Sequence, residues 1–135
     1  MSDLQRFVDA QGRVIARVRD ELKAGEKKSH WMWFIFPQIA GLGRSETARR
    51  FAIASLDEAK AYAGHPVLGP RLRECTALVL GARGRNAQAI FGHPDDLKFR
   101  SCMTLFARAT GDPLFVKALE NFFGGEEDTE TVKRI

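Results

Sequence analysis

The sequence has little of what would support a disulfide framework, a metal site or a membrane span. Its two cysteines, Cys75 and Cys102, lie in apolar surroundings without CxxC spacing, so we predict buried free thiols in a reducing, cytoplasmic compartment. Its three histidines, His30, His65 and His93, are too far apart for a metal-ligand motif, and we expect neither a metal nor a cofactor. No apolar run approaches the ~20 residues that span a bilayer, and the N-terminal residues carry no signal-peptide pattern, so we expect no membrane contact.

The sequence also lacks sustained alternation of apolar and polar residues, internal repeats and a long linker. Apolar residues recur instead at helical spacing, as in Leu68, Leu72, Cys75 and Val79. We therefore predict one compact all-α domain, residues 1–135, with seven or eight short helices around an aromatic core. The expected helical ranges are 3–10 and 13–24 (a hairpin or one bent helix), 46–51, 55–63, 65–81, 87–91, 94–109, 113–123 and a last short helix from 128 or 129.

Capping residues indicate where several of these helices begin. Ser55 and Glu58 form a capping box, and Asn86 is placed to cap a short turn. Asp112 followed by Pro113 is typical of an N-cap and a first helical residue. These signals place the starts of three helices independently of the apolar pattern.

The charge distribution favours an anionic ligand. The formal net charge is +4 and the isoelectric point is about 9.4. Arginines cluster at 44–50 and 71–85, whereas acidic residues gather at 126–130. A basic surface attracts phosphates, although a solvated arginine-rich face would have the same composition.

The stretch 28–38 holds both tryptophans and is the most apolar part of the chain. Every position from Trp31 to Phe36 is hydrophobic, so periodicity leaves a buried strand and a buried helical turn equally open. Pro37 ends the run, and a single strand or hairpin here is the main alternative within the all-α prediction. His30 and Gln38 flank aromatic surface, which suits a planar ligand held by stacking and edge hydrogen bonds. His30 could equally be a structural cap of a core segment.

A glycine-containing turn follows this stretch. Gly41 and Gly43 allow close backbone approach, Arg44 comes next, and Ser45 can cap the following helix. A turn of this kind before a helix N-terminus can bind an anion. An ordinary connection between two elements has the same composition.

The second informative stretch is 93–106, most of which belongs to the predicted helix 94–109 with its wide apolar face. Asp95, Lys98 and Ser101 lie on one side of this helix, and Asp96 is next to Asp95 in its first turn. One interpretation is structural: Asp95 or Asp96 caps the helix and Lys98 pairs with it. The other is a carboxylate held beside a lysine in a cleft, available as an acid or as a partner of a ribose hydroxyl.

With both stretches in view, the chain resembles an uncharacterised bacterial family, domain-of-unknown-function family 1810, whose members are sometimes mislabelled calpastatin. The resemblance implies a mainly helical fold and no established activity. It covers nearly the whole chain. Its motifs are residues 29–38, Gly41-Leu42-Gly43, Glu58-Ala59, 65–72, Phe91-Gly92, 95–98 and 101–106.

Residues 103–125, with the turn Thr110-Gly111-Asp112, are also similar to part of the NADAR superfamily, which is linked to NAD and ADP-ribose chemistry. That similarity implies binding or hydrolysis of an ADP-ribose-like or NAD-like N-glycosidic nucleotide. The alternative is a non-catalytic nucleotide- or protein-binding module, and we do not expect nucleic acid as a partner. Cleavage would pass through an oxocarbenium-like state that needs an acidic group beside the sugar. The candidate catalytic residues are Asp95, Asp96 and His30, and the candidate ligand-binding residues are Trp31, Trp33, Gln38, Arg44, Lys98 and Ser101.

Overall fold

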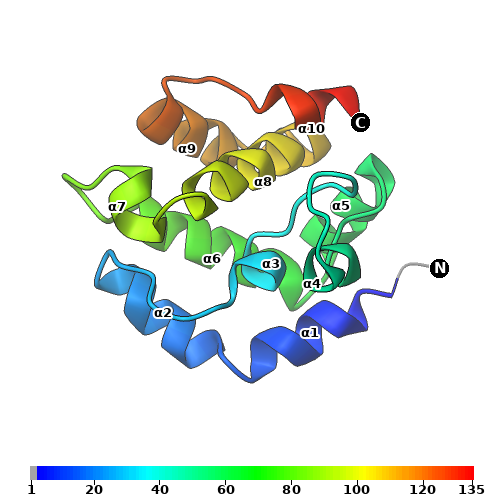
Figure 1. The fold of residues 1–135 in the computed structure, drawn as a ribbon, viewed down its shortest axis with the longest axis horizontal. Coiled ribbons are helices and arrows are strands. Elements are labelled where there is room, and N and C mark those ends of the chain that lie inside the picture. The colour runs from blue at the N-terminus through cyan, green and yellow to red at the C-terminus, as the bar shows by residue number, and fades with distance from the viewer. Residues whose placement is uncertain (1–2) are drawn as a thin grey trace.

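Residues 3–135, the part of the chain that the computed structural model describes, form ten helices and no strand (Figure 1). The all-α prediction is confirmed, but the predicted number of seven or eight helices was too low. The difference arises because 5–12 and 15–23 are two helices and the apolar stretch adds another. In chain order the helices are α1 (Gln5–Gly12), α2 (Ile15–Lys23), α3 (Met32–Ile35), α4 (Glu46–Arg50), α5 (Leu56–Gly64), α6 (Leu68–Leu80), α7 (Ala87–Phe91), α8 (Asp95–Thr110), α9 (Pro113–Phe123) and α10 (Thr129–Lys133).

Helix α8 is the centre of the fold, because it packs against α5, α7, α9 and α10 (Figure 1). All its residues from Ser101 to Phe106 are buried, and so is Phe99. A helix that is buried around most of its circumference needs apolar or small side chains on several faces. Phe99, Met103 and Phe106 form one apolar stripe and Cys102, Leu105 and Ala109 form a neighbouring one, and together they meet that requirement.

The predicted N-caps are present at the starts of three helices. The side chains of Ser55, Asn86 and Asp112 accept hydrogen bonds from the N–H groups of residues 58, 89 and 114 at 3.1, 2.8 and 2.9 Å. For the last helix, the sequence left Asp128 and Thr129 open as caps, and Asp128 is the one that accepts from Thr131. These bonds satisfy N–H groups that have no partner within the helix.

The apolar stretch forms a single helical turn, α3, and not a strand. Trp31, Met32, Ile35 and Phe36 are buried, whereas Trp33 and Phe34 are partly exposed and line different cavities. The chain then runs extended past Pro37, where the N–H of Ile53 donates to the carbonyl of Gln38 at 2.8 Å. This contact fixes the position of Gln38 beside the helical turn.

The core is aromatic, as predicted. Phe99 of α8 stacks on Phe91 with ring centroids 4.8 Å apart and meets Phe36 edge-on at 5.0 Å. Cys75 and Cys102 are free and buried, in agreement with the prediction, and burial raises the pKa of the Cys75 thiol to about 12. None of the helices in residues 3–135 has the length and apolar composition to cross a bilayer.

Candidate functional site

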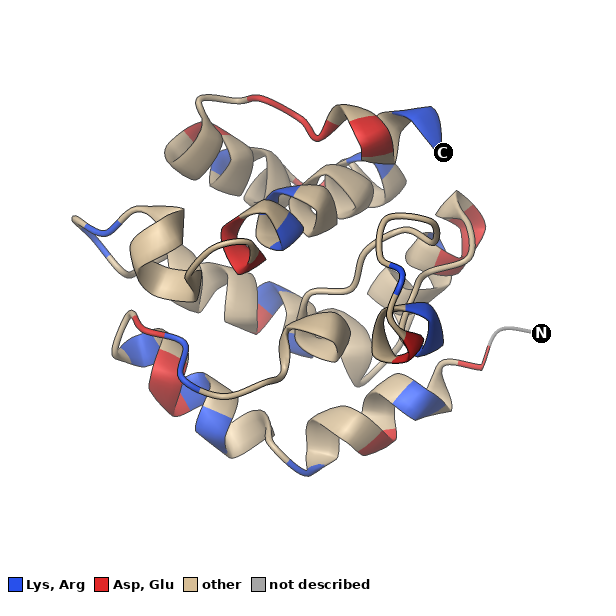
Figure 2. Cartoon of the chain, viewed as in Figure 1, with Lys and Arg blue, Asp and Glu red and all other residues tan. Residues whose placement is uncertain are grey.

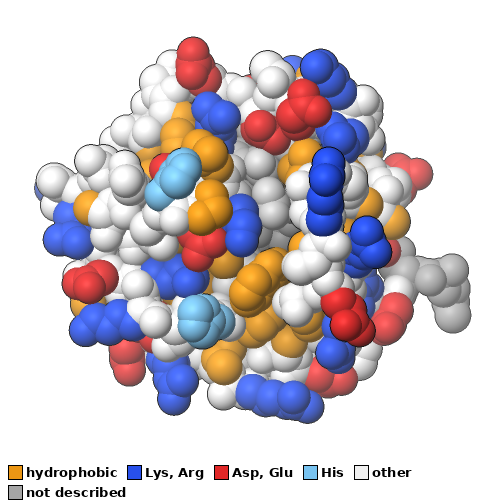
Figure 3. Space-filling view, viewed as in Figure 1, with side chains coloured by type: hydrophobic (Ala, Val, Ile, Leu, Met, Phe, Trp, Pro, Cys, Tyr) orange, Lys and Arg blue, Asp and Glu red, His pale blue; other side chains and the backbone are white. Residues whose placement is uncertain are grey.

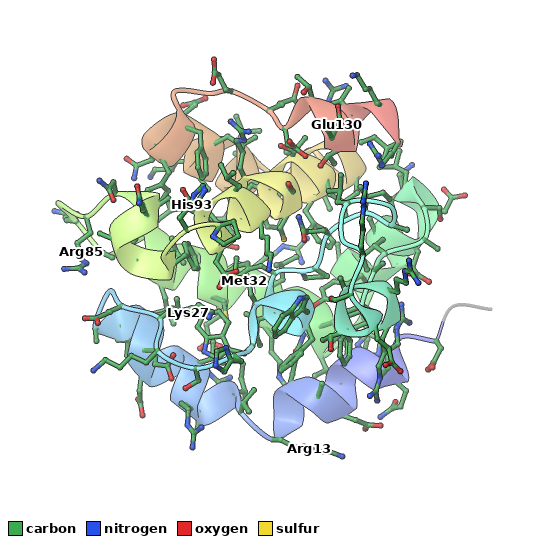
Figure 4. All side chains as sticks on the ribbon, viewed as in Figure 1. Arg13, Lys27, Met32, Arg85, His93 and Glu130 are labelled. Atoms are coloured by element: carbon green, nitrogen blue, oxygen red, sulfur yellow. The ribbon has the colours of Figure 1, made fainter. Side chains whose placement is uncertain are left out.

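A cleft of about 450 Å³ lies where α3, α4, α8 and α10 meet, and we call it the Trp33 cleft. Figure 3 shows this face of the molecule, with apolar side chains gathered at its middle and basic side chains beside them. In Figure 4, His93 marks the segment before α8 and Met32 marks α3, and Pro94 and Trp33 from these two segments line the same cleft. The lining residues are Trp33, Gln38, Leu42, Gly43, Arg44, Ser45, Ala48, Pro94, Leu97, Lys98, Ser101, Asp128 and Glu130.

The partly exposed indole of Trp33 forms one wall of this cleft. The ammonium group of Lys98 lies 5.1 Å from the centroid of the Trp33 ring, a cation–π distance. Gln38 borders the cleft beside Trp33, and both residues also line a smaller pocket of about 150 Å³ behind the turn at Gly43. An aromatic face, an amide and a cation therefore surround the same space.

The buried carboxylate of Glu21, which lies on α2, binds the segment that leads into α3. One of its oxygens, Oε1, accepts hydrogen bonds from the N–H groups of Lys28 and Ser29 and from the indole N–H of Trp31, at 2.6, 3.0 and 3.0 Å. The Ser29 hydroxyl donates to Oε2 at 2.6 Å. Burial by itself raises the pKa of Glu21, but these hydrogen bonds outweigh it and lower the pKa from 4.5 to about 2.

A second carboxylate, Asp95, joins the start of α8 to the segment before α3. It forms ion pairs with Lys27 at 3.1 Å and with Lys98 at 3.2 Å. Lys27 in turn lies 5.3 Å from the ring centroid of Trp31. Asp95 therefore holds Lys98 beside the cleft while its own carboxylate is occupied by two lysines.

The side of the cleft towards α10 is held by Asp128. Its Oδ2 lies 3.0 Å from the Ser101 hydroxyl and also accepts hydrogen bonds from the N–H and hydroxyl of Thr131. Ser101 also reaches the carbonyl of Leu97 at 3.1 Å. The buried Ser101 hydroxyl thus connects α8 to α10 at the base of the cleft.

The glycine-containing turn forms the opposite rim. Gly41 has a φ of +99°, a conformation that favours glycine, and Ser45 caps α4 by accepting from the N–H of Ala48 at 3.1 Å. Arg44 is exposed on this rim and forms no ion pair with the part of the chain that the structure describes. Its charge is available to an anion in the cleft.

Five of the six candidate ligand-binding residues line this one cleft: Trp33, Gln38, Arg44, Lys98 and Ser101. The sixth, Trp31, does not, because its ring is completely buried in the core and its N–H is bonded to Glu21. A ring without exposed surface offers no face to a ligand, so we correct its role to a structural one.

The three candidate catalytic residues are not among the residues that line the cleft. His30 is exposed before α3, Asp95 is paired with two lysines, and Oδ1 of Asp96 accepts a hydrogen bond of 3.0 Å from Nδ1 of His93. Neither aspartate caps α8, whose N-cap residue is Pro94. Of the structural interpretation, the pairing of Asp95 with Lys98 is present, whereas the predicted capping of α8 by Asp95 or Asp96 is wrong.

Sequence reasoning missed Glu21 and treated Asp128 only as a possible helix cap. Glu21 lies in a helix rich in charged residues, where an acidic side chain normally faces water. Its spacing from Arg17, four residues earlier, does not predict that N–H groups of residues 28–31 donate hydrogen bonds to its carboxylate. Among residues 3–135, no group of three or more His, Cys, Asp or Glu residues is placed to hold a metal ion.

The chain matches the profile of a protein family and is similar to a protein of known structure. The profile of the family described as "Protein of unknown function (DUF1810)" matches residues 1–135. The conserved hypothetical protein Rv1873 from Mycobacterium tuberculosis has a similar crystal structure, with a TM-score of 0.96 and 56% sequence identity. The match covers 97% of this chain and 94% of that one. No curated protein matches. Neither match bears on the similarity of residues 103–125 to the NADAR superfamily, which stays a prediction.

Proposed function

Because the chain belongs to the protein family of unknown function DUF1810, whose description states no activity, we propose its function from the cleft itself. The Trp33 cleft binds a small anionic ligand that carries a planar ring, of the nucleotide or ADP-ribose class. The observation that carries this proposal is the convergence of Trp33, Gln38, Arg44 and Lys98 on one space. These four residues come from three separate parts of the sequence.

The chemistry of the lining groups fits such a ligand. An indole face contributes about 1–3 kcal/mol per stacked base, and an amide can bond to the edge of the base. Arg44 and Lys98 supply charge for a phosphate, and arginine can bind it with two parallel hydrogen bonds. A volume of about 450 Å³ is within the usual range for small-molecule sites.

The carboxylates of the cleft favour binding over hydrolysis. Asp128 is surrounded by the donors Ser101 and Thr131, and Glu130 pairs with Lys133 and Arg134. Hydrogen bonds from Arg134 and Lys133 hold the pKa of Glu130 below its usual value. A general acid must be protonated near neutral pH, so Glu130 is poorly suited to act as the general acid of glycosidic cleavage. Incubation with NAD or ADP-ribose should therefore leave the ligand intact on chromatography.

The test is a thermal-shift and calorimetry screen with AMP, GMP, NAD, ADP-ribose and inorganic phosphate. A ligand at 100 times its Kd should raise the free energy of unfolding by roughly 2.7 kcal/mol. Trp33→Leu should weaken binding at least about tenfold, because it removes the stacking face. Phe34→Leu is the matched control: it changes the next aromatic side chain of α3, which lines a different cavity.

The outcomes separate the candidate functions. Loss of binding in Trp33→Leu with binding retained in Phe34→Leu supports the proposal. Equal loss in both variants would mean that α3 is only structurally required. Flat curves for every ligand would remove the nucleotide proposal and leave a protein-binding module as the better hypothesis.

A further inference from the structure

A second cavity, of about 430 Å³, lies between the α6–α7 loop and α9, on residues that the Trp33 cleft does not use. Three of its lining residues are basic, Arg83, Arg85 and Lys117, and Asn121 adds an amide. Figure 2 shows basic residues on this loop and on α9 beside it, and Figure 4 marks Arg85 at the loop. We call this cavity the Arg83 pocket.

The local backbone places these groups around one space. The loop turns at Gly84, whose φ is +78°, and the N–H of Arg83 donates to the carbonyl of Gly81 at 2.9 Å. Arg85 is steadied by a hydrogen bond of 3.2 Å from its guanidinium to the carbonyl of Ala89. Lys117 and Asn121 are four residues apart on α9 and therefore share one face of that helix.

The pocket has positive charge without a balancing acid. No Asp or Glu lines it, and its three basic side chains form no ion pair within residues 3–135. Like charges that line one cavity repel one another, and the carbonyl end of α6 offsets only part of this repulsion. A bound anion would remove the remainder.

We propose that the Arg83 pocket binds the phosphate group of a small molecule. Two guanidinium groups can each form paired hydrogen bonds with phosphate oxygens, and Lys117 adds a point charge. The amide of Asn121 donates a further hydrogen bond. This site is separate from the Trp33 cleft, and the inference does not depend on the function proposed for that cleft.

The test is an NMR titration of the ¹⁵N-labelled full-length protein with inorganic phosphate, pyrophosphate and ribose 5-phosphate at millimolar concentration. The backbone amide of Gly84 and the side-chain amide of Asn121 should shift with saturation. Arg83→Gln and Lys117→Gln should each weaken binding about tenfold, because each removes a charge-assisted hydrogen bond. Arg13→Gln removes the same charge from an exposed residue that Figure 4 shows far from Arg85, and it should leave the affinity unchanged.

Each outcome decides the proposal. Tighter binding of ribose 5-phosphate than of inorganic phosphate would indicate a phosphorylated metabolite, and the reverse order would indicate free phosphate as the ligand. Three results would overturn the proposal: no shift at Gly84 and Asn121, shifts confined to 41–45, or equal weakening by Arg13→Gln and Arg83→Gln. The last result would mean that the anions respond only to net charge.

Discussion

Replacing Glu21 by glutamine should destabilise the protein by removing one buried charge while keeping the shape of its site. In Glu21→Gln the remaining carbonyl oxygen can still accept from Lys28, Ser29 and Trp31, and the new amide group can donate to the Ser29 hydroxyl. The difference between the ordinary pKa of 4.5 and a pKa of about 2 corresponds to about 3 kcal/mol. We expect a loss of roughly 2–3 kcal/mol at pH 7, since hydrogen bonds to a charged acceptor are the stronger ones.

The pH dependence of this loss has a definite sign. The pKa of Glu21 is lower in the folded protein, so the unfolded chain binds its proton first as the pH falls. The stabilisation is therefore fully present above about pH 4.5 and is lost as the pH falls towards 2. Carboxylates elsewhere in the chain also titrate in this range, so the difference between wild type and variant is the informative quantity.

Urea unfolding followed by circular dichroism, from pH 7 down to pH 2.5, measures this difference. Glu74→Gln is the matched control, because it removes an exposed carboxylate paired with Arg19 at 2.9 Å and should cost less than about 1 kcal/mol. The reasoning would be refuted if Glu21→Gln cost no more than the control at pH 7. It would also fail if the gap between wild type and Glu21→Gln did not narrow as the pH was lowered.

Two further predictions concern packing. A Cβ on Gly69 would overlap the carbonyl oxygen of Ala63, so Gly69→Ala should lower the free energy of unfolding by about 1–3 kcal/mol. Gly64 has open space around it, so Gly64→Ala should be neutral or slightly stabilising, and urea unfolding of both variants measures the difference. Cys75 and Cys102 should react with a thiol reagent only at the rate of unfolding, because both are buried and burial raises the pKa of each thiol; appreciable labelling under native conditions would contradict this.

Several residues of the candidate site could be predicted because each is a polar or charged residue next to a proline, a glycine or a residue of opposite charge. Gln38 follows a proline that ends an apolar run, Arg44 follows two glycines, and Lys98 lies one helical turn after Asp95. Those features identified residues, but they did not establish that the two stretches meet. The contact between them requires α8 to cross beside α3, which depends on packing among α5, α7, α8 and α9.

The two tryptophans have different roles that sequence patterns could not predict. Trp31 and Trp33 are two residues apart in a run where every side chain is apolar, so no periodicity distinguishes a core position from a cleft wall. The tertiary structure separates them, because Glu21 binds the indole N–H of Trp31 inside the core and leaves Trp33 beside Lys98.

The sequence by itself determined the helical class, several helix starts and the buried face of the central helix. These properties follow from interactions between residues a few positions apart: capping side chains at Ser55, Asn86 and Asp112, and apolar spacing along 94–109. Only the tertiary structure decided the ion pair between Lys27 and Asp95, the burial of Glu21 and the meeting of α3, α4, α8 and α10 at the Trp33 cleft. Each of these depends on distances between segments far apart in the chain, which local patterns do not encode.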